Sequence, residues 1–180
     1  MLDPTLALPT LALLTRTPAT LDALLRTLPD ARTRANEGPN TWNACDVLGH
    51  LIFGERTDWM PRIHIILDHG ESRPFDPFDR WGHVREIEGK SLPHLLDEFA
   101  AIRAQKLDEL RALHLTPADL EKRGRHPSLG VVTLSQLLAA WTVHDLTHLH
   151  QIARILAHQD RAAVGPWAQY LGVLQCNGHG

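Results

Sequence analysis

The chain has 180 residues, of which 43% are hydrophobic and 22% are charged, and its formal net charge is −3. This size and composition predict one soluble globular domain over residues 1–180 and exclude a disordered chain. The mild negative charge excludes general electrostatic attraction to nucleic acid.

The N-terminal segment is expected to be helical. Leucines recur at helical spacing through residues 1–30, and Thr17 followed by Pro18 predicts that this helix is broken or kinked there. Residues 30–41 are polar and contain the sequence Gly-Pro-Asn, which predicts a turn.

A second helix is expected over residues 44–67. Either Thr41 or Asn43 can cap its first turn, and Pro61 inside it predicts a kink. Residues 68–90 follow, rich in proline, aspartate and aromatic residues. We expect them to form a long irregular loop, and such loops in compact domains are often functional.

The remaining segments predict two more long helices. A third helix is expected over residues 91–113, and Thr116-Pro117 opens a short turn to about Lys122. The sequence KRGRHPSLG (122–130) predicts a short hairpin or a loop. A capping-box pattern at Thr133 then opens a fourth helix to about residue 157.

One further short helix is expected near the C-terminus, opened by Pro166. Four principal helices with little strand propensity predict an all-α fold, an antiparallel four-helix bundle with a short extra C-terminal helix. Sites in such bundles are commonly built from inward-facing side chains of several helices.

Two histidines on the fourth helix are candidate metal ligands. His144 and His148 are four residues apart, so they share one face of the helix, and the apolar pattern predicts that this face points inward. Gln151 continues the same face. With twelve histidines in 180 residues, however, one such pair is about what random placement gives.

A third ligand is available on the second helix, where His50 can also point inward. By spacing alone, a buried histidine with ordinary hydrogen bonds explains His50 better, because no second ligand accompanies it on its own helix. Three imidazoles would leave coordination positions open for water or substrate, as in reactive metal sites. Neutral imidazole suits zinc, nickel, iron or copper.

Motifs of other enzyme classes are missing. The sequence HDLTH at 144–148 differs from the zinc-protease motif H-E-x-x-H, because aspartate is too short for the usual base role. Nucleophile-elbow, P-loop and dinucleotide-binding patterns do not occur.

Five segments together resemble the DinB-like (DinB/YfiT) superfamily. The resemblance covers nearly the whole chain and has one histidine on the second helix and H-x-x-x-H-x-x-Q on the fourth. The segments are WNACDVLGHL (42–51), PFDPFD (74–79), SLPHLLDEF (91–99), WTVHDLTHLHQIARIL (141–156) and GPWAQYL (165–171).

The resemblance implies a bundle that is often a homodimer, with His50, His144 and His148 binding a divalent metal ion. Zinc or nickel is expected first, with iron or manganese as alternatives. Relatives with known activities suggest a metal-dependent thiol S-transferase that activates a low-molecular-weight thiol. In this interpretation Gln151 supports a metal ligand from behind or orients a water molecule, although a plain helix-surface amide remains an equal alternative.

Two other functions stay open. The first is a metal-dependent hydrolase that uses metal-bound water and takes Asp46, Glu55 or Asp145 as its base. The second is a non-catalytic metal-binding or ligand-sensing bundle. In each case the expected ligand is a small molecule. No nucleic acid or membrane partner is expected, because the sequence offers no extended basic surface and no apolar run of ~18 residues.

The two cysteines, Cys45 and Cys176, are far apart and form no C-x-x-C pattern. They argue against a disulfide scaffold, so a reducing cytoplasm is the expected location.

Overall fold

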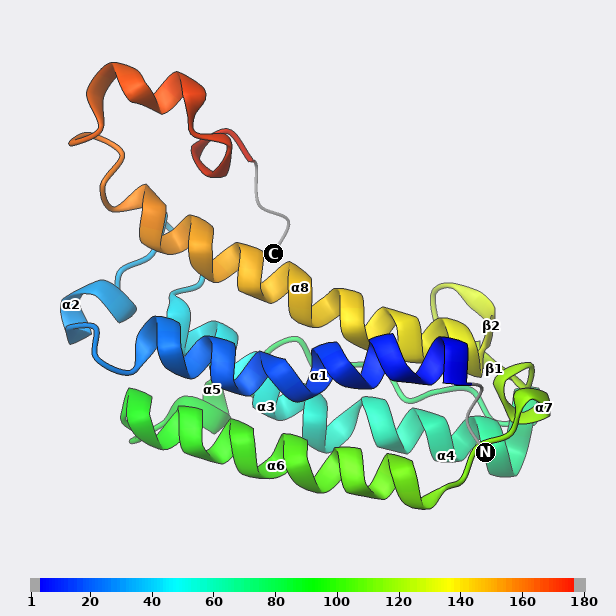
Figure 1. Ribbon diagram of the computed structural model, residues 1–180. Helices are drawn as coiled ribbons and strands as arrows, with labels where there is room; N and C mark the ends of the chain where they lie inside the picture. The colour runs from blue at the N-terminus through cyan, green and yellow to red at the C-terminus, as the bar shows by residue number, and fades with distance from the viewer. Residues whose placement is uncertain (1–3, 177–180) are drawn as a thin grey trace.

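Four helical rods form the bundle in the computed structural model, which describes residues 4–176, with side chains from residue 11 onward (Figure 1). The rods are α1 (Pro4–Leu25), α3 with α4 (Ala44–Thr57 and Trp59–His69), α6 (Leu92–Ala112) and α8 (Leu134–His158). α1 and α8 run in one direction, and α3, α4 and α6 run in the other. The predicted all-α four-helix bundle is confirmed.

The first rod is one continuous helix, so the predicted break at Thr17-Pro18 is wrong. Pro18 has no N–H with which to bond the carbonyl of Leu14 four residues earlier. The Nη1 of Arg103 on α6 donates to that carbonyl instead, at 2.9 Å. Because the freed carbonyl has a partner, the proline is accommodated inside the helix.

The second rod is interrupted at Asp58, three residues before the expected kink at Pro61. A proline removes the hydrogen bond to the carbonyl four residues earlier, here that of Thr57, and its ring crowds that carbonyl. The helix therefore ends at Thr57 and restarts as α4. Asn43 is the cap of α3, since its Oδ1 accepts from the backbone N–H of Cys45 at 2.8 Å.

Two segments that were predicted to be irregular contain short helices. α2 (Asp30–Thr33) lies in the polar segment and α5 (Gly82–Ile87) lies in the 68–90 loop, after the 3-10 turn η1 (Gly70–Ser72). α5 packs against α3 at two glycines. A Cβ on Gly49 would lie 2.4 Å from Ile87 Cγ2, and one on Gly82 would lie 2.2 Å from the Phe53 ring.

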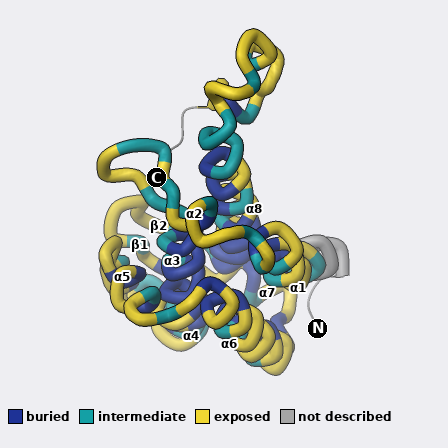
Figure 2. The backbone as a smooth tube through the Cα atoms, turned by 90° about the vertical axis from the view of Figure 1, so that its left-hand side faces the viewer, coloured by how far each residue is buried: buried dark blue, intermediate teal, exposed yellow. Residues whose placement is uncertain are grey.

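The segment between α6 and α8 forms the hairpin that the sequence allowed. After α7 (Pro117–Leu120), β1 (Arg123–His126) pairs antiparallel with β2 (Gly130–Thr133). The capping box at Thr133 is confirmed: its hydroxyl accepts from the N–H of Gln136, and the Gln136 side chain accepts from the Thr133 N–H at 2.9 Å. Figure 2 shows the hairpin at the side of the bundle.

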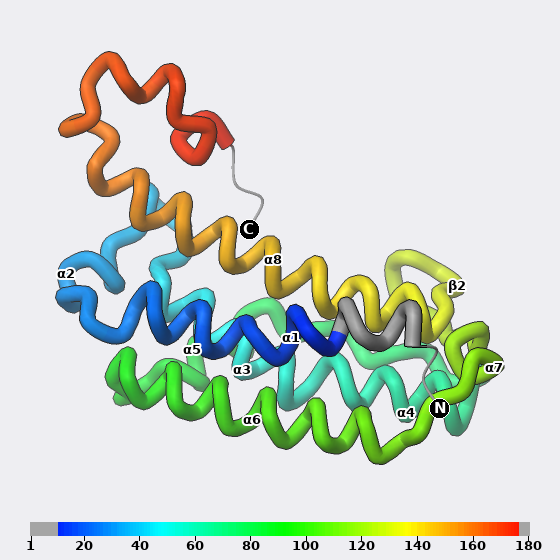
Figure 3. The backbone as a smooth tube through the Cα atoms, in the orientation of Figure 1, coloured from blue at the N-terminus to red at the C-terminus, as the bar shows by residue number. Residues whose placement is uncertain are grey.

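The C-terminal segment leaves the bundle after α8 (Figure 3). In place of one short helix it contains two 3-10 segments, η2 (Gly165–Tyr170) and η3 (Gly172–Leu174). None of the described helices is long and apolar enough to cross a membrane.

The core consists of two apolar clusters stacked along the bundle axis. One contains Trp59 and Trp141, and the other contains Phe99 and Ile152. The guanidinium of Arg103 lies at the junction, 4.9 Å from the Phe99 ring centre and 5.5 Å from that of Trp141. Buried polar groups therefore gather at mid-length of the bundle.

A candidate metal centre between α3 and α8

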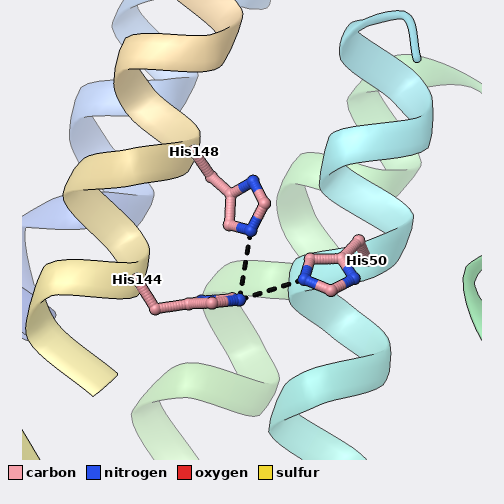
Figure 4. Close-up of side chains that lie close together, drawn as sticks. All are labelled: His50, His144 and His148. Atoms are coloured by element: carbon pink, nitrogen blue, oxygen red, sulfur yellow. Dashed lines mark hydrogen bonds between the residues drawn. The ribbon is translucent and has the colours of Figure 1, made fainter. Parts of the chain in front are cut away.

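Three histidine side chains meet between α3 and α8 (Figure 4). Nε2 of His144 lies 3.0 Å from Nε2 of His50 and 3.1 Å from Nε2 of His148. One nitrogen from each ring lies within 4.8 Å of the other two, so the group could hold a metal ion. Two nitrogens bound tetrahedrally to zinc at about 2.0–2.1 Å lie about 3.3 Å apart, close to these separations.

The surroundings keep these imidazoles neutral. Burial, with smaller contributions from the neighbouring His148 and His83, lowers the pKa of His50 to about 3. Burial likewise lowers the pKa of His144 to about 2, with contributions from His148, His50 and Arg103. The pKa of His148 is also lowered, again mainly by burial. Since metals bind the neutral form, the environment favours the ligand state of each ring.

Gln151 sets the orientation of one of the rings. It is 5% exposed, which excludes the helix-surface alternative, and its Oε1 lies 2.7 Å from Nδ1 of His148. The amide oxygen can only accept, so Nδ1 carries the proton and the lone pair of Nε2 faces the other histidines. Nδ1 of His50 and of His144 is buried without a hydrogen-bond partner among the described residues.

Two hollows are lined by the histidines and a third lies next to them beside Gln151, and we name each after one of its lining residues. The Asp58 hollow, of about 420 Å³, is lined by His50, Asp58, Trp59, Arg62, Arg80 and His144, among others. The Thr147 hollow, of about 310 Å³, is lined by Trp42, His50, Phe78, Arg80, His144, Thr147 and His148. The Glu37 hollow, of about 370 Å³, lies beside Gln151.

The carboxylates that the hydrolase hypothesis named as bases are engaged elsewhere. Glu55 and Asp145 both bind the buried Arg103, at 2.8 and 2.6 Å, and Trp141 Nε1 donates to Glu55 at 3.0 Å. Asp46 accepts from the backbone N–H of Asn43 at the start of α3. None of the three lines a hollow at the histidines, so that assignment is wrong for this geometry.

Sequence reasoning missed Asp58, which lines the same hollow as His50 and His144. Burial raises the pKa of Asp58 to about 6, against the opposing charge of Arg62, whose Nη2 lies 2.7 Å away. The i,i+4 spacing to Arg62 and the proline three residues on were the available signals. Together these two signals indicate that Asp58 is a charged residue at the junction of two helices.

The 68–90 loop also lines the site, through Pro77, Phe78 and Arg80. In the same loop, His83 is 3% exposed and packs on Trp42 with ring centres 4.6 Å apart. Trp42 and Trp59 line hollows, whereas Trp141 is fully buried core.

The fold and the three clustered histidines define a helical-bundle protein with a candidate metal centre. The model of the DinB superfamily matches residues 13–152, so the chain belongs to the DinB superfamily. No curated protein matches the chain.

One solved structure with the same fold is described as "YfiT from Bacillus subtilis is a probable metal-dependent hydrolase with an unusual four-helix bundle topology". It superposes with a TM-score of 0.70 at 18% identity, over 87% of this chain and 86% of that one. At this identity the likeness establishes the fold alone.

Proposed function

We propose that the protein is a divalent-metal-dependent thiol S-transferase, with His50, His144 and His148 as the metal ligands. The observation that carries the proposal is the position of the histidines. His50 and His144 line both the Asp58 hollow and the Thr147 hollow. A thiol and an electrophile can therefore approach the same point from two sides. Zinc or nickel suits three imidazole nitrogens better than the harder manganese, with iron as a further alternative.

Each part of the site has a chemical role in this proposal. A bound dication lowers the pKa of a coordinated thiol and keeps it as the nucleophilic thiolate at neutral pH. Gln151 holds the His148 ring in its ligand tautomer. Trp42 and Phe78 give the Thr147 hollow an apolar wall that excludes water from the thiol.

A second candidate function is metal-dependent hydrolysis, which Asp58 favours. Its carboxylate lines the Asp58 hollow, and a pKa of about 6 suits a general base near neutral pH. In this alternative Asp58 takes a proton from the attacking water, and Arg62 holds the carboxylate in place at 2.7 Å.

Metal analysis tests the ligand assignment. We expect about one metal ion per chain in the wild type and less than about a tenth of that in His50→Ala and His148→Ala, because two imidazoles hold a dication weakly. His150→Ala is the matched control, since His150 is an exposed histidine on the same helix. Undiminished metal content in both ligand variants would exclude this site.

Turnover assays separate the candidate functions. Thiol transfer is measured with 2-mercaptoethanol, 3-mercaptopropionate and glutathione against 1-chloro-2,4-dinitrobenzene, and hydrolysis with 4-nitrophenyl acetate. Transfer that requires metal and persists in Asp58→Asn supports the transferase. Metal-dependent hydrolysis that Asp58→Asn abolishes supports the hydrolase, and bound metal without turnover supports a metal-binding or sensing bundle. The homodimer stays a prediction, which light scattering checks.

A further inference from the structure

The side chain of Arg80 stands apart from the other arginines. Among the residues that the structure describes, it is the one arginine with neither a hydrogen-bond nor an ion-pair partner for its guanidinium. The acidic residue beside it is already engaged. Asp79 accepts from Arg85 at 2.7 Å and from the backbone N–H of Trp81 at 3.0 Å.

The backbone of Arg80 is held in place although its side chain is unpaired. Nδ1 of His83 donates to the carbonyl of Arg80 at 3.0 Å, and His83 itself is buried against Trp42. The backbone of Arg80 is therefore fixed beside the site, and its side chain extends from there.

Arg80 lines both hollows at the histidines and also the Glu37 hollow beside Gln151. In the Asp58 hollow the other two ionised groups, Asp58 and Arg62, pair with each other at 2.7 Å. In the Glu37 hollow, Glu37 pairs with Arg154 at 2.6 Å. The remaining charge in each of these hollows is that of Arg80.

In the Thr147 hollow, too, the unpaired charge is that of Arg80. Its lining holds neutral imidazoles, Trp42, Phe78 and Thr147, so the guanidinium of Arg80 is its one charged group. A dication at the histidines would add positive charge beside it. The electrostatic field of the site thus selects for negative charge.

We infer that Arg80 binds an anionic group, a carboxylate or a phosphate, of a small molecule whose reacting end faces the three histidines. A guanidinium presents two parallel N–H donors that match either group. The inference rests on the proposed function, because the histidines supply the other attachment point. It makes Arg80 a residue that determines specificity, and it gives the 68–90 loop the role of selecting anionic substrates.

Binding of two small thiols to the Co²⁺-loaded protein tests the inference. The probes are 3-mercaptopropionate and 2-mercaptoethanol, which differ in the carboxylate, and the absorbance of thiolate bound to Co²⁺ gives each Kd. Because Arg80 is exposed, we expect a preference for 3-mercaptopropionate of about five- to tenfold at low salt, decreasing as salt is added.

The substitution Arg80→Gln should remove this preference while leaving the Kd of 2-mercaptoethanol unchanged. Arg73→Gln is the control, because Arg73 is an exposed arginine of the same loop that pairs with Asp76 and lines none of the three hollows. An unchanged preference in Arg80→Gln overturns the inference.

Failure of the proposed function gives a different result. If Co²⁺ is bound and neither thiol changes its absorbance, the thiol-transferase proposal falls. The role of Arg80 is then tested with propionate and 1-propanol. The measured quantity is the relaxation that the bound Co²⁺ causes in the proton resonances of each probe. Stronger relaxation of propionate that Arg80→Gln removes supports the anion site, and equal relaxation in both proteins overturns it.

Discussion

Two buried polar clusters lie side by side in this bundle and differ in almost every property. His144 and Asp145 are consecutive on α8, yet one faces the histidine cluster and the other faces Arg103. The Arg103 cluster is charged and sealed in the core. The histidine cluster is neutral, keeps unpartnered Nδ1 atoms and opens to hollows.

The difference separates structural groups from functional ones. Arg103 on α6 reaches the Leu14 carbonyl on α1, Glu55 on α3 and Asp145 on α8, so one guanidinium joins all four rods. The histidines join only α3 and α8. Trp141 links the two clusters, since it donates to Glu55 and stacks on Trp59, whose ring contacts His144. The charged cluster thus fixes the rods that position the ligands.

The largest expected effect comes from removing the central cation. Arg103→Met leaves Glu55 and Asp145 buried without a counter-charge, and breaking a buried pair in this way costs about 3–5 kcal/mol. Chemical denaturation should show this loss in the free energy of unfolding. Arg26→Met is the matched control, because Arg26 makes its ion pairs to Asp22 and Asp97 at the surface. Equal stability of the two variants would contradict this role of Arg103.

The same variant should gain stability as the pH falls. Burial already raises the pKa of Glu55 above its ordinary value with Arg103 present. Without Arg103, the Glu55 carboxyl stays protonated to a higher pH in the folded chain than in the unfolded chain. Stability is therefore lost as the pH rises through the raised pKa of Glu55, and the deficit relative to wild type should narrow as the pH falls toward the ordinary range of a carboxyl group.

A smaller effect is expected at the hydrogen bond between Gln151 and His148. Gln151→Leu removes the acceptor of His148 Nδ1 and should weaken metal binding about 10- to 100-fold. Competition with a chelator measures the affinity. Gln151→Glu keeps an acceptor and should retain the affinity. A similar loss in both variants would show that Gln151 acts through packing instead.

This contrast also explains what the sequence could predict. The long helices follow from apolar periodicity and caps, and the pair His144 and His148 follows from i,i+4 spacing. His50 lies 94 residues from His144, so spacing alone left it open, and only the resemblance to the superfamily assigned it. The position of Gln151 beside His148 also follows from spacing, because residues three apart on a helix are neighbours.

The Arg103 cluster and the hollows depend on contacts far apart in sequence. Arg103 binds Glu55 across 48 residues and Asp145 across 42, and no local pattern records these contacts. The same holds for α5, whose packing depends on small residues at Gly49 and Gly82. Arg80 lies at the site for the same reason: the fold places the 68–90 loop there, and no local pattern in that loop indicates it.

The smallest expected change in stability comes from the histidine cluster itself. His144→Leu removes a ring whose buried Nδ1 has no partner, which favours the variant, but it also takes away the Nε2 that lies 3.0 Å from His50 and 3.1 Å from His148. The two effects oppose each other, so the net cost is small. In the presence of a chelator, the free energy of unfolding should stay within about 1 kcal/mol of wild type, although metal binding is lost. Ile152→Ala, a fully buried position on the same helix, should cost about 2–5 kcal/mol. A loss in His144→Leu as large as that in Ile152→Ala would mean that the metal-free histidines stabilise the bundle as the Arg103 cluster does.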